Sequence, residues 1–104
     1  MTKTKEQTKK ESENVFGLCA GRHEMPCTEF IFQEVKDPFD FNLLNKTIEE
    51  KLKNINSNEK ITIYVTGLTV LLTSVLEYCF KNNIKVELKH FNIATQEYVS
   101  QDIL

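Results

Sequence analysis

Apolar residues recur along this chain with two different periods, and the change from one period to the other predicts the succession of secondary structure. Steps of three and four separate the apolar positions of residues 41–55, which predicts an amphipathic helix with Asp40 as its N-cap. A second segment with this period predicts a helix over residues 69–82, which the pair Asn82-Asn83 ends in a left-handed conformation. The apolar stripe of the first helix consists of Phe41, Leu44, Ile48, Leu52 and Ile55.

The remaining apolar segments are short and predict strands. Residues 61–65 form an almost continuous apolar run, which is typical of a strand that is covered on both faces. Residues 84–91 alternate strictly, so Ile84, Val86, Leu88 and His90 share one face. The segments 14–20 and 28–35 predict two strands near the start, joined either as a hairpin or as a pair with an irregular loop. A weaker strand is expected at 97–103.

This succession, β-β-α-β-α-β-β, predicts an α/β fold. We expect a Rossmann-like, mostly parallel sheet with flanking helices and an antiparallel strand at one or both ends. Residues 14–104 form a single predicted domain. Residues 1–13 contain no large apolar residue after Met1, and they are expected to be a disordered tail.

Composition narrows the class of protein further. The net charge of −2 provides no basic field for duplex nucleic acid or an anionic membrane, so neither is an expected partner. The apolar run from Ile61 to Phe80 is interrupted by polar residues and does not predict a membrane span. Three irregularly spaced cysteines indicate reduced thiols and a cytoplasmic location, and Cys79 is interpreted as a small core residue.

One candidate site lies where the third predicted strand ends and the second helix begins, in Val65-Thr66-Gly67-Leu68-Thr69. Gly67 permits a tight turn and a close approach of ligand to backbone. Thr66 or Thr69 is a candidate helix cap, and the first-turn N–H groups of the helix favour an anion. A plain strand–helix turn with a threonine cap is an equally good interpretation, because the lysine of a phosphate-binding P-loop is missing.

A second candidate site is the loop Gly21-Arg22-His23-Glu24. Arg22 is the sole arginine among thirteen basic residues, and its planar guanidinium suits phosphate or carboxylate. His23 is a candidate acid, base or donor near neutral pH, and Glu24 a candidate base or a partner of Arg22. If the first strand lies beside the third, both loops emerge at one carboxyl edge of the sheet. The alternative is a solvated turn.

The sequence gives less support to further catalytic or metal-binding sites. His90 is a third catalytic candidate beside His23 and Glu24, but a hydrogen-bonded histidine at the rim of the core explains it as well. Cys19, His23 and Cys27 are spaced by four residues, which is unlike the closer pairs of zinc sites. No metal and no cofactor are therefore predicted.

Two features of the chain resemble known proteins. The segment with Thr66-Gly67-Leu68-Thr69 between a strand and an apolar helix resembles the ligand-binding part of CRISPR-associated Rossmann-fold domains, and departs from it at Leu68 and Val70. The resemblance implies binding of a cyclic oligonucleotide across a symmetric dimer. "GRHE" near the start, "YVTGLT" and the ending "HFNxxTxEY" also look like small proteins of bacteriophages and mobile elements, which implies an accessory or counter-defence role.

The leading hypothesis is therefore a homodimeric protein that binds a nucleotide or other phosphorylated ligand, such as a cyclic nucleotide signal of antiviral defence. Its candidate ligand-binding residues are Gly21, Arg22, His23, Thr66, Gly67, Leu68 and Thr69. A ring-nuclease-like hydrolase acting on such a ligand is the first alternative, and a protein-interaction module without a small ligand is the second. Whether the protein is an enzyme stays open, with binding favoured.

Overall fold

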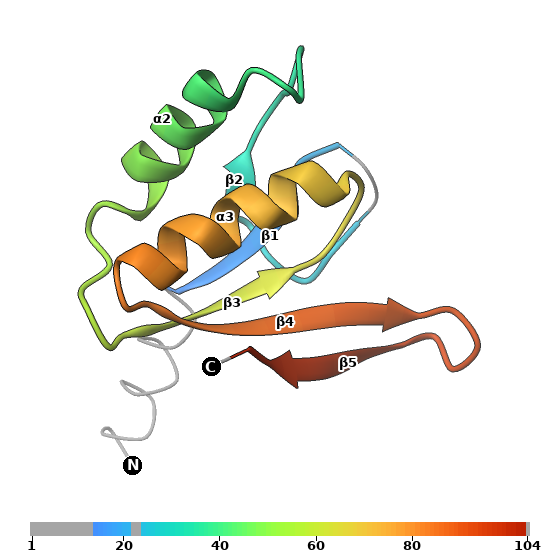
Figure 1. Cartoon of the computed structure of the whole chain (residues 1–104). Coiled ribbons are helices and arrows are strands. Elements are labelled where there is room, and N and C mark those ends of the chain that lie inside the picture. Colours follow the sequence, from blue (N-terminus) through green and yellow to red (C-terminus); the bar gives the residue numbers. More distant parts are fainter. Residues whose placement is uncertain (1–13, 22–23, 104) are drawn as a thin grey trace.

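The protein folds around one five-stranded sheet with two helices, as the computed structural model of residues 14–21 and 24–103 shows (Figure 1). The predicted disordered tail, residues 1–13, lies outside the described residues. The α/β class is confirmed. Along the chain the elements are β1 (Val15–Cys19), β2 (Phe30–Phe32), α2 (Phe41–Leu52), β3 (Lys60–Tyr64), α3 (Thr69–Lys81), β4 (Lys85–Asn92) and β5 (Glu97–Asp102).

The order of strands across the sheet, β2-β1-β3-β4-β5, differs from their order along the chain. Strands β1 to β4 run parallel, while β5 pairs antiparallel with β4, so the sheet is mixed. β1 and β2 are parallel neighbours, which makes the hairpin interpretation wrong and leaves the irregular loop. The described part of this loop, residues 20–21 and 24–29, contains no helix.

Both helices lie on one face of the sheet and pack against each other (Figure 1). A Rossmann sheet has helices on both faces, so the expected arrangement of flanking helices is corrected here. The burial of β3 reflects this difference. Ile61 and Ile63 are fully buried, whereas Thr62 and Tyr64 on the opposite face are only half-buried. The interpretation of this strand as covered on both faces was therefore wrong.

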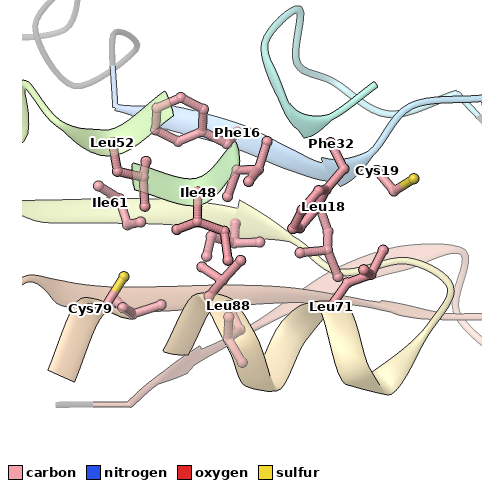
Figure 2. Close-up of a cluster of buried hydrophobic side chains, with 14 of the residues drawn as sticks. Phe16, Leu18, Cys19, Phe32, Ile48, Leu52, Ile61, Leu71, Cys79 and Leu88 are labelled. Atoms are coloured by element: carbon pink, nitrogen blue, oxygen red, sulfur yellow. The ribbon is translucent and has the colours of Figure 1, made fainter. Parts of the chain in front are cut away.

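The core lies between the sheet and the helices (Figure 2). Strands β1, β3 and β4 contribute alternate aliphatic or aromatic residues to it, and each helix contributes its apolar stripe. The buried core residues are Phe16, Leu18, Cys19, Ile31, Phe32, Leu44, Ile48, Leu52, Ile61, Ile63, Leu71, Val75, Cys79, Ile84, Val86 and Leu88. The predicted assignment of Cys79 to the core is confirmed.

The predicted capping residues at the helix ends were largely correct. The Asp40 carboxylate accepts a hydrogen bond from the backbone N–H of Leu43, so it caps α2 as expected. Asn83 has a left-handed φ of 58°, and its neighbour Asn82 is the C-cap of α3. α2 ends at Leu52 rather than residue 55, and Ile55 packs against the core from the following turn.

Candidate site at the carboxyl edge of the sheet

The carboxyl ends of three neighbouring strands, β2, β1 and β3, meet at one edge of the sheet, because these strands are parallel. A cavity of about 210 Å³ opens there. The loop after β1, the loop after β2 and the beginning of α3 provide its walls. The residues that line it are Cys19, Ala20, Gly21, Gln33, Glu34, Val35, Leu68 and Leu71.

The turn between β3 and α3 has the geometry of an open helix N-terminus. Gly67 has a φ of +66°, a conformation that strongly favours glycine. α3 begins at Thr69 with Leu68 as its N-cap, and no side chain caps it. The expectation that Thr66 or Thr69 caps the helix was therefore wrong. The first turn also contains no acidic residue, so no carboxylate of its own neutralises the positive end of the helix dipole.

Thr66 is a buried polar residue of this turn. It is only 5% exposed, and its hydroxyl has no hydrogen-bond partner within the described part of the chain. A buried hydroxyl without a partner costs free energy, of the order of 1–3 kcal/mol. The turn that precedes α3 thus keeps both an uncapped helix end and an unsatisfied hydroxyl.

The loop after β1 reaches the same cavity through Gly21. The φ of Gly21 is +81°, and a Cβ added there would meet no atom within 4 Å. Gly21 is therefore required by its backbone conformation and not by crowding. Arg22 and His23, the two residues with the most distinctive chemistry in the sequence, lie outside the described residues. Glu24 is exposed and is not among the residues that line the cavity.

Sequence reasoning missed Gln33 and Glu34, which line the cavity from the loop after β2. They were interpreted as the end of a longer second strand, residues 28–35, whereas β2 ends at Phe32. The signal that could have found them is topological. A polar pair directly after a parallel strand lies at the ligand-binding edge of an α/β sheet.

His90 does not line the cavity. Its Nε2 atom lies 2.8 Å from Oε1 of Gln101 on β5, and the ring is half-buried on β4. The histidine is therefore held by a neighbouring strand beyond the part of β4 that pairs with β3. This geometry fits the interpretation as a hydrogen-bonded histidine at the rim of the core.

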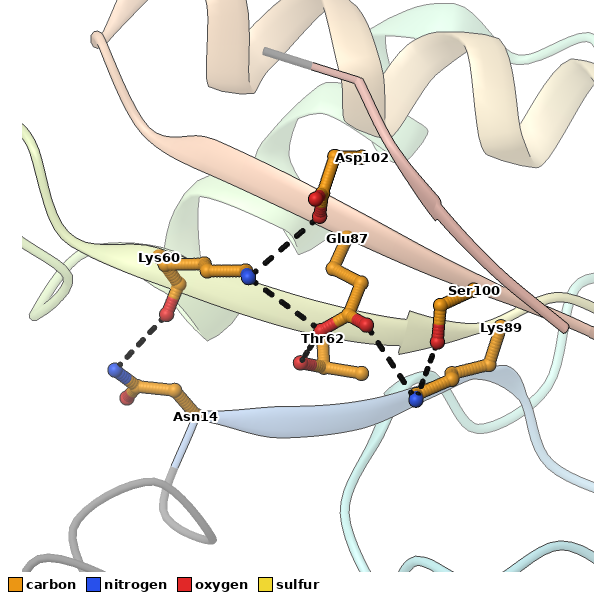
Figure 3. Close-up of polar contacts among 7 residues, drawn as sticks. All are labelled: Asn14, Lys60, Thr62, Glu87, Lys89, Ser100 and Asp102. Carbon is orange, nitrogen blue, oxygen red and sulfur yellow. Dashed lines mark hydrogen bonds and ion pairs between the residues drawn. The ribbon is translucent and has the colours of Figure 1, made fainter. Parts of the chain in front are cut away.

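The face of the sheet without helices carries a polar network (Figure 3). Nζ of Lys60 lies 3.6 Å from both Glu87 and Asp102, and Nζ of Lys89 lies 3.4 Å from Glu87 and 2.6 Å from the Ser100 hydroxyl. A hydrogen bond from Ser100 is the main cause that lowers the pKa of Glu87. Burial opposes it, and the charges of Lys89 and Lys60 add to the lowering. Each charged member of the network thus lies near a group of opposite charge.

Burial makes the thiols of Cys27 and Cys79 poor nucleophiles. Burial raises the pKa of Cys79 to about 12, and burial also raises the pKa of Cys27. Within residues 14–21 and 24–103, no group of three or more His, Cys, Asp or Glu side chains could hold a metal ion. The two helices of this same part of the chain are too short to cross a bilayer.

Comparisons of the chain with models of protein families, with curated proteins and with solved structures found no match. The resemblance to CRISPR-associated Rossmann-fold domains therefore stays a prediction from the sequence.

Proposed function

We propose that the chain binds a nucleotide or another phosphorylated ligand at the carboxyl edge of its sheet, with the phosphate at the N-terminus of α3. The supporting observation is the cavity of about 210 Å³ at which an uncapped helix N-terminus meets the loops after β1 and β2. Backbone N–H groups and the helix dipole favour an anion at such a position. Gly67 leaves the backbone of the turn accessible, since it has no side chain.

The biological role that we infer follows the resemblance of the sequence. It is an accessory or counter-defence protein of a bacteriophage or mobile element, whose ligand is a cyclic nucleotide signal. Hydrolysis of that ligand has less support than binding, because His90 is bonded to Gln101 and Glu24 does not line the cavity.

The decisive variant is Leu68→Asp, with Leu68→Asn as its matched control. Both side chains are good N-caps, so both should keep or raise the stability of α3. Asp adds a negative charge where the phosphate is proposed to bind, and Asn does not. We expect Leu68→Asp to weaken binding of a cyclic dinucleotide or of inorganic phosphate by at least tenfold more than Leu68→Asn, by calorimetry. Equal affinities for the two variants would exclude this helix end as the anion site.

Arg22 provides a second test, which rests on the sequence alone. It follows Gly21, which lines the cavity. Arg22→Ala should remove a charge-assisted contact to the phosphate, worth about 1.5–3 kcal/mol of binding free energy, and leave the melting temperature unchanged. The control is Lys53→Ala, which makes the same change of charge on the exposed C-cap residue of α2. Unchanged affinity in Arg22→Ala would remove Arg22 from the proposed site.

A protein-interaction role is the second candidate, and exposed apolar side chains favour it. Phe39, Phe41 and Leu43 are 69%, 50% and 56% exposed at the start of α2, and the rings of Phe39 and Phe41 are in edge contact. An open groove of about 610 Å³ separates this helix from the edge strand β2. We propose this surface as the interface of the expected homodimer. Sedimentation should give a dimer for the native chain and a monomer for Leu43→Lys, whereas a native monomer at high micromolar concentration would exclude it.

A further inference from the structure

The open groove between α2 and the edge strand β2 has walls on two different elements. One wall is α2, which contributes Leu43 and Lys46, and the other is β2 with the residues after it, which contributes Phe30 and Glu34. In the described part of the chain β2 pairs with β1 only, so this second wall is an edge of the sheet (Figure 1). A second molecule therefore reaches both walls from solvent without displacing a strand.

Four charged side chains line this groove, two of each sign. They are Glu34, Lys46, Glu50 and Lys51. Lys51 and Glu50 each have an ion-pair partner outside the groove, at 2.8 and 3.6 Å. The side chains of Lys46, on the α2 wall, and Glu34, on the β2 wall, make no ion pair or hydrogen bond with any residue that the structure describes. Each wall thus keeps one charge, of opposite sign to the other, that no described residue neutralises.

A second copy of this chain is the partner that fits such a groove. The two surfaces of a twofold dimer are identical, so an interface of this type must be complementary to itself. If the twofold axis runs along the groove, α2 of each copy lies opposite the β2 wall of the other. Lys46 then faces Glu34 of the partner subunit, and symmetry forms the same pair a second time.

The apolar residues of the α2 wall support the same arrangement. Leu43 is 56% exposed and lies one helical turn from Lys46, so it is positioned to enter the partner's groove together with that lysine. A strongly basic or strongly acidic partner would pair with one of the two charges and be repelled by the other. The groove therefore favours a partner surface that carries both signs on opposite sides, as its own surface does.

We propose that this groove is the interface of a twofold homodimer in which Lys46 of each copy pairs with Glu34 of the partner subunit. The inference rests on the proposed function, because it requires the homodimer named there, and it adds which wall meets which. Charge pairs at the rim of an interface fix its register and its choice of partner, while the exposed apolar residues at the start of α2 provide buried area.

Reversal of the two charges tests the pairing by sedimentation of the full chain. Lys46→Glu and Glu34→Lys each create two like-charge pairs across the axis, so each variant alone should dimerise at least about tenfold more weakly than the native chain. An equimolar mixture of the two variants should recover the native affinity, because both pairs have opposite charges in the heterodimer. Lys85→Glu is the control, since it reverses an exposed lysine of β4 outside the groove and should leave dimerisation unchanged.

The outcomes separate this pairing from the interface on which it depends. A native dimer that Leu43→Lys disrupts, but that neither charge reversal weakens, would overturn the pairing and leave the interface standing. Recovery in a chain that carries both reversals, without recovery in the mixture, would show that the two charges act within one copy and would overturn the pairing as well. A native monomer at high micromolar concentration would overturn the pairing and the interface together, and leave the groove for a chemically different partner.

Discussion

The two faces of the sheet are built from alternate residues of the same strands, yet different forces stabilise them. On the helix-covered face, Ile61, Ile63 and their neighbours are fully buried in an apolar core. On the open face, Thr62 and Glu87 are half-buried and take part in hydrogen bonds and ion pairs (Figure 3). The comparison teaches that a single layer of helices is sufficient when side chains of the sheet itself partly cover the second face.

Aromatic rings extend this cover toward the carboxyl edge. The rings of Tyr64 and Tyr98 meet edge to face with centroids 4.8 Å apart. The ring centroids of Phe91 and Tyr98 lie 5.2 Å apart. Each such pair contributes about 0.5–1.5 kcal/mol beyond its buried area. The open face is therefore an ordered surface of rings and charges, and its stability should respond to pH and to substitution differently from the core.

The largest loss of stability is expected from a substitution on the helix-covered face. Ile63→Ala should lower the free energy of unfolding by about 2–5 kcal/mol, because it leaves a cavity at a fully buried position of the central strand β3. Thr62→Ala, one residue away on the open face, should cost less than about 1 kcal/mol. Urea denaturation of both variants measures the difference. Similar losses for the two would mean that the open face is packed as tightly as the core.

The next largest loss of stability is expected from a substitution of Gly17, which makes a close contact on the open face. A Cβ at Gly17 would lie 2.6 Å from the ring of Phe30 and 3.0 Å from Sγ of Cys27. Gly17→Ala should therefore cost about 1–3 kcal/mol through overpacking. Phe30→Leu in the same chain should recover part of the loss, which a double-mutant cycle in urea would detect. Strict additivity of the two changes would contradict the proposed clash.

A smaller and pH-dependent effect is expected from the polar network. The pKa of Glu87 is lower in the folded protein than its usual value near 4.5. The ionised carboxylate therefore stabilises the fold at pH values above 4.5, and this contribution is lost as the pH falls through the lowered folded pKa. Glu87→Gln should cost about 1 kcal/mol at pH 7.

Melting temperatures of the native chain and of Glu87→Gln, recorded from pH 7 to pH 3, check this expectation. The gap between the two should narrow toward the acid end. A gap that stays constant over the whole range would show that the lost packing of the side chain, and not its charge, causes the effect.

The smallest effect is expected at the rim of the same network. Asp102 is 72% exposed and lies 3.6 Å from Nζ of Lys60. Exposed ion pairs of this kind contribute little, so Asp102→Asn should change the free energy of unfolding by less than about 0.5 kcal/mol. The same urea experiments measure it. A loss as large as that of Glu87→Gln would show that the network acts as one unit instead of depending on its half-buried member.

Much of the local structure could be predicted from short-range patterns. The N-cap at Asp40, the left-handed Asn83 and the alternation of residues 84–91 are each encoded within a few residues, because caps and faces depend on local geometry. The positive φ of Gly67 belongs to the same class, since few other residues adopt it readily. Predictions that concerned contacts between distant segments were less successful.

The sequence by itself determined the α/β class, the approximate position of each element and the presence of a glycine turn before the second helix. The tertiary structure alone decided that β1 lies between β2 and β3, that both helices lie on one face, and that Gln33 and Glu34 line the cavity with Leu68. The physical reason is the range of the interactions. Periodicity and turn chemistry act over a few residues, whereas the order of strands depends on the burial of the complete apolar surface of the chain.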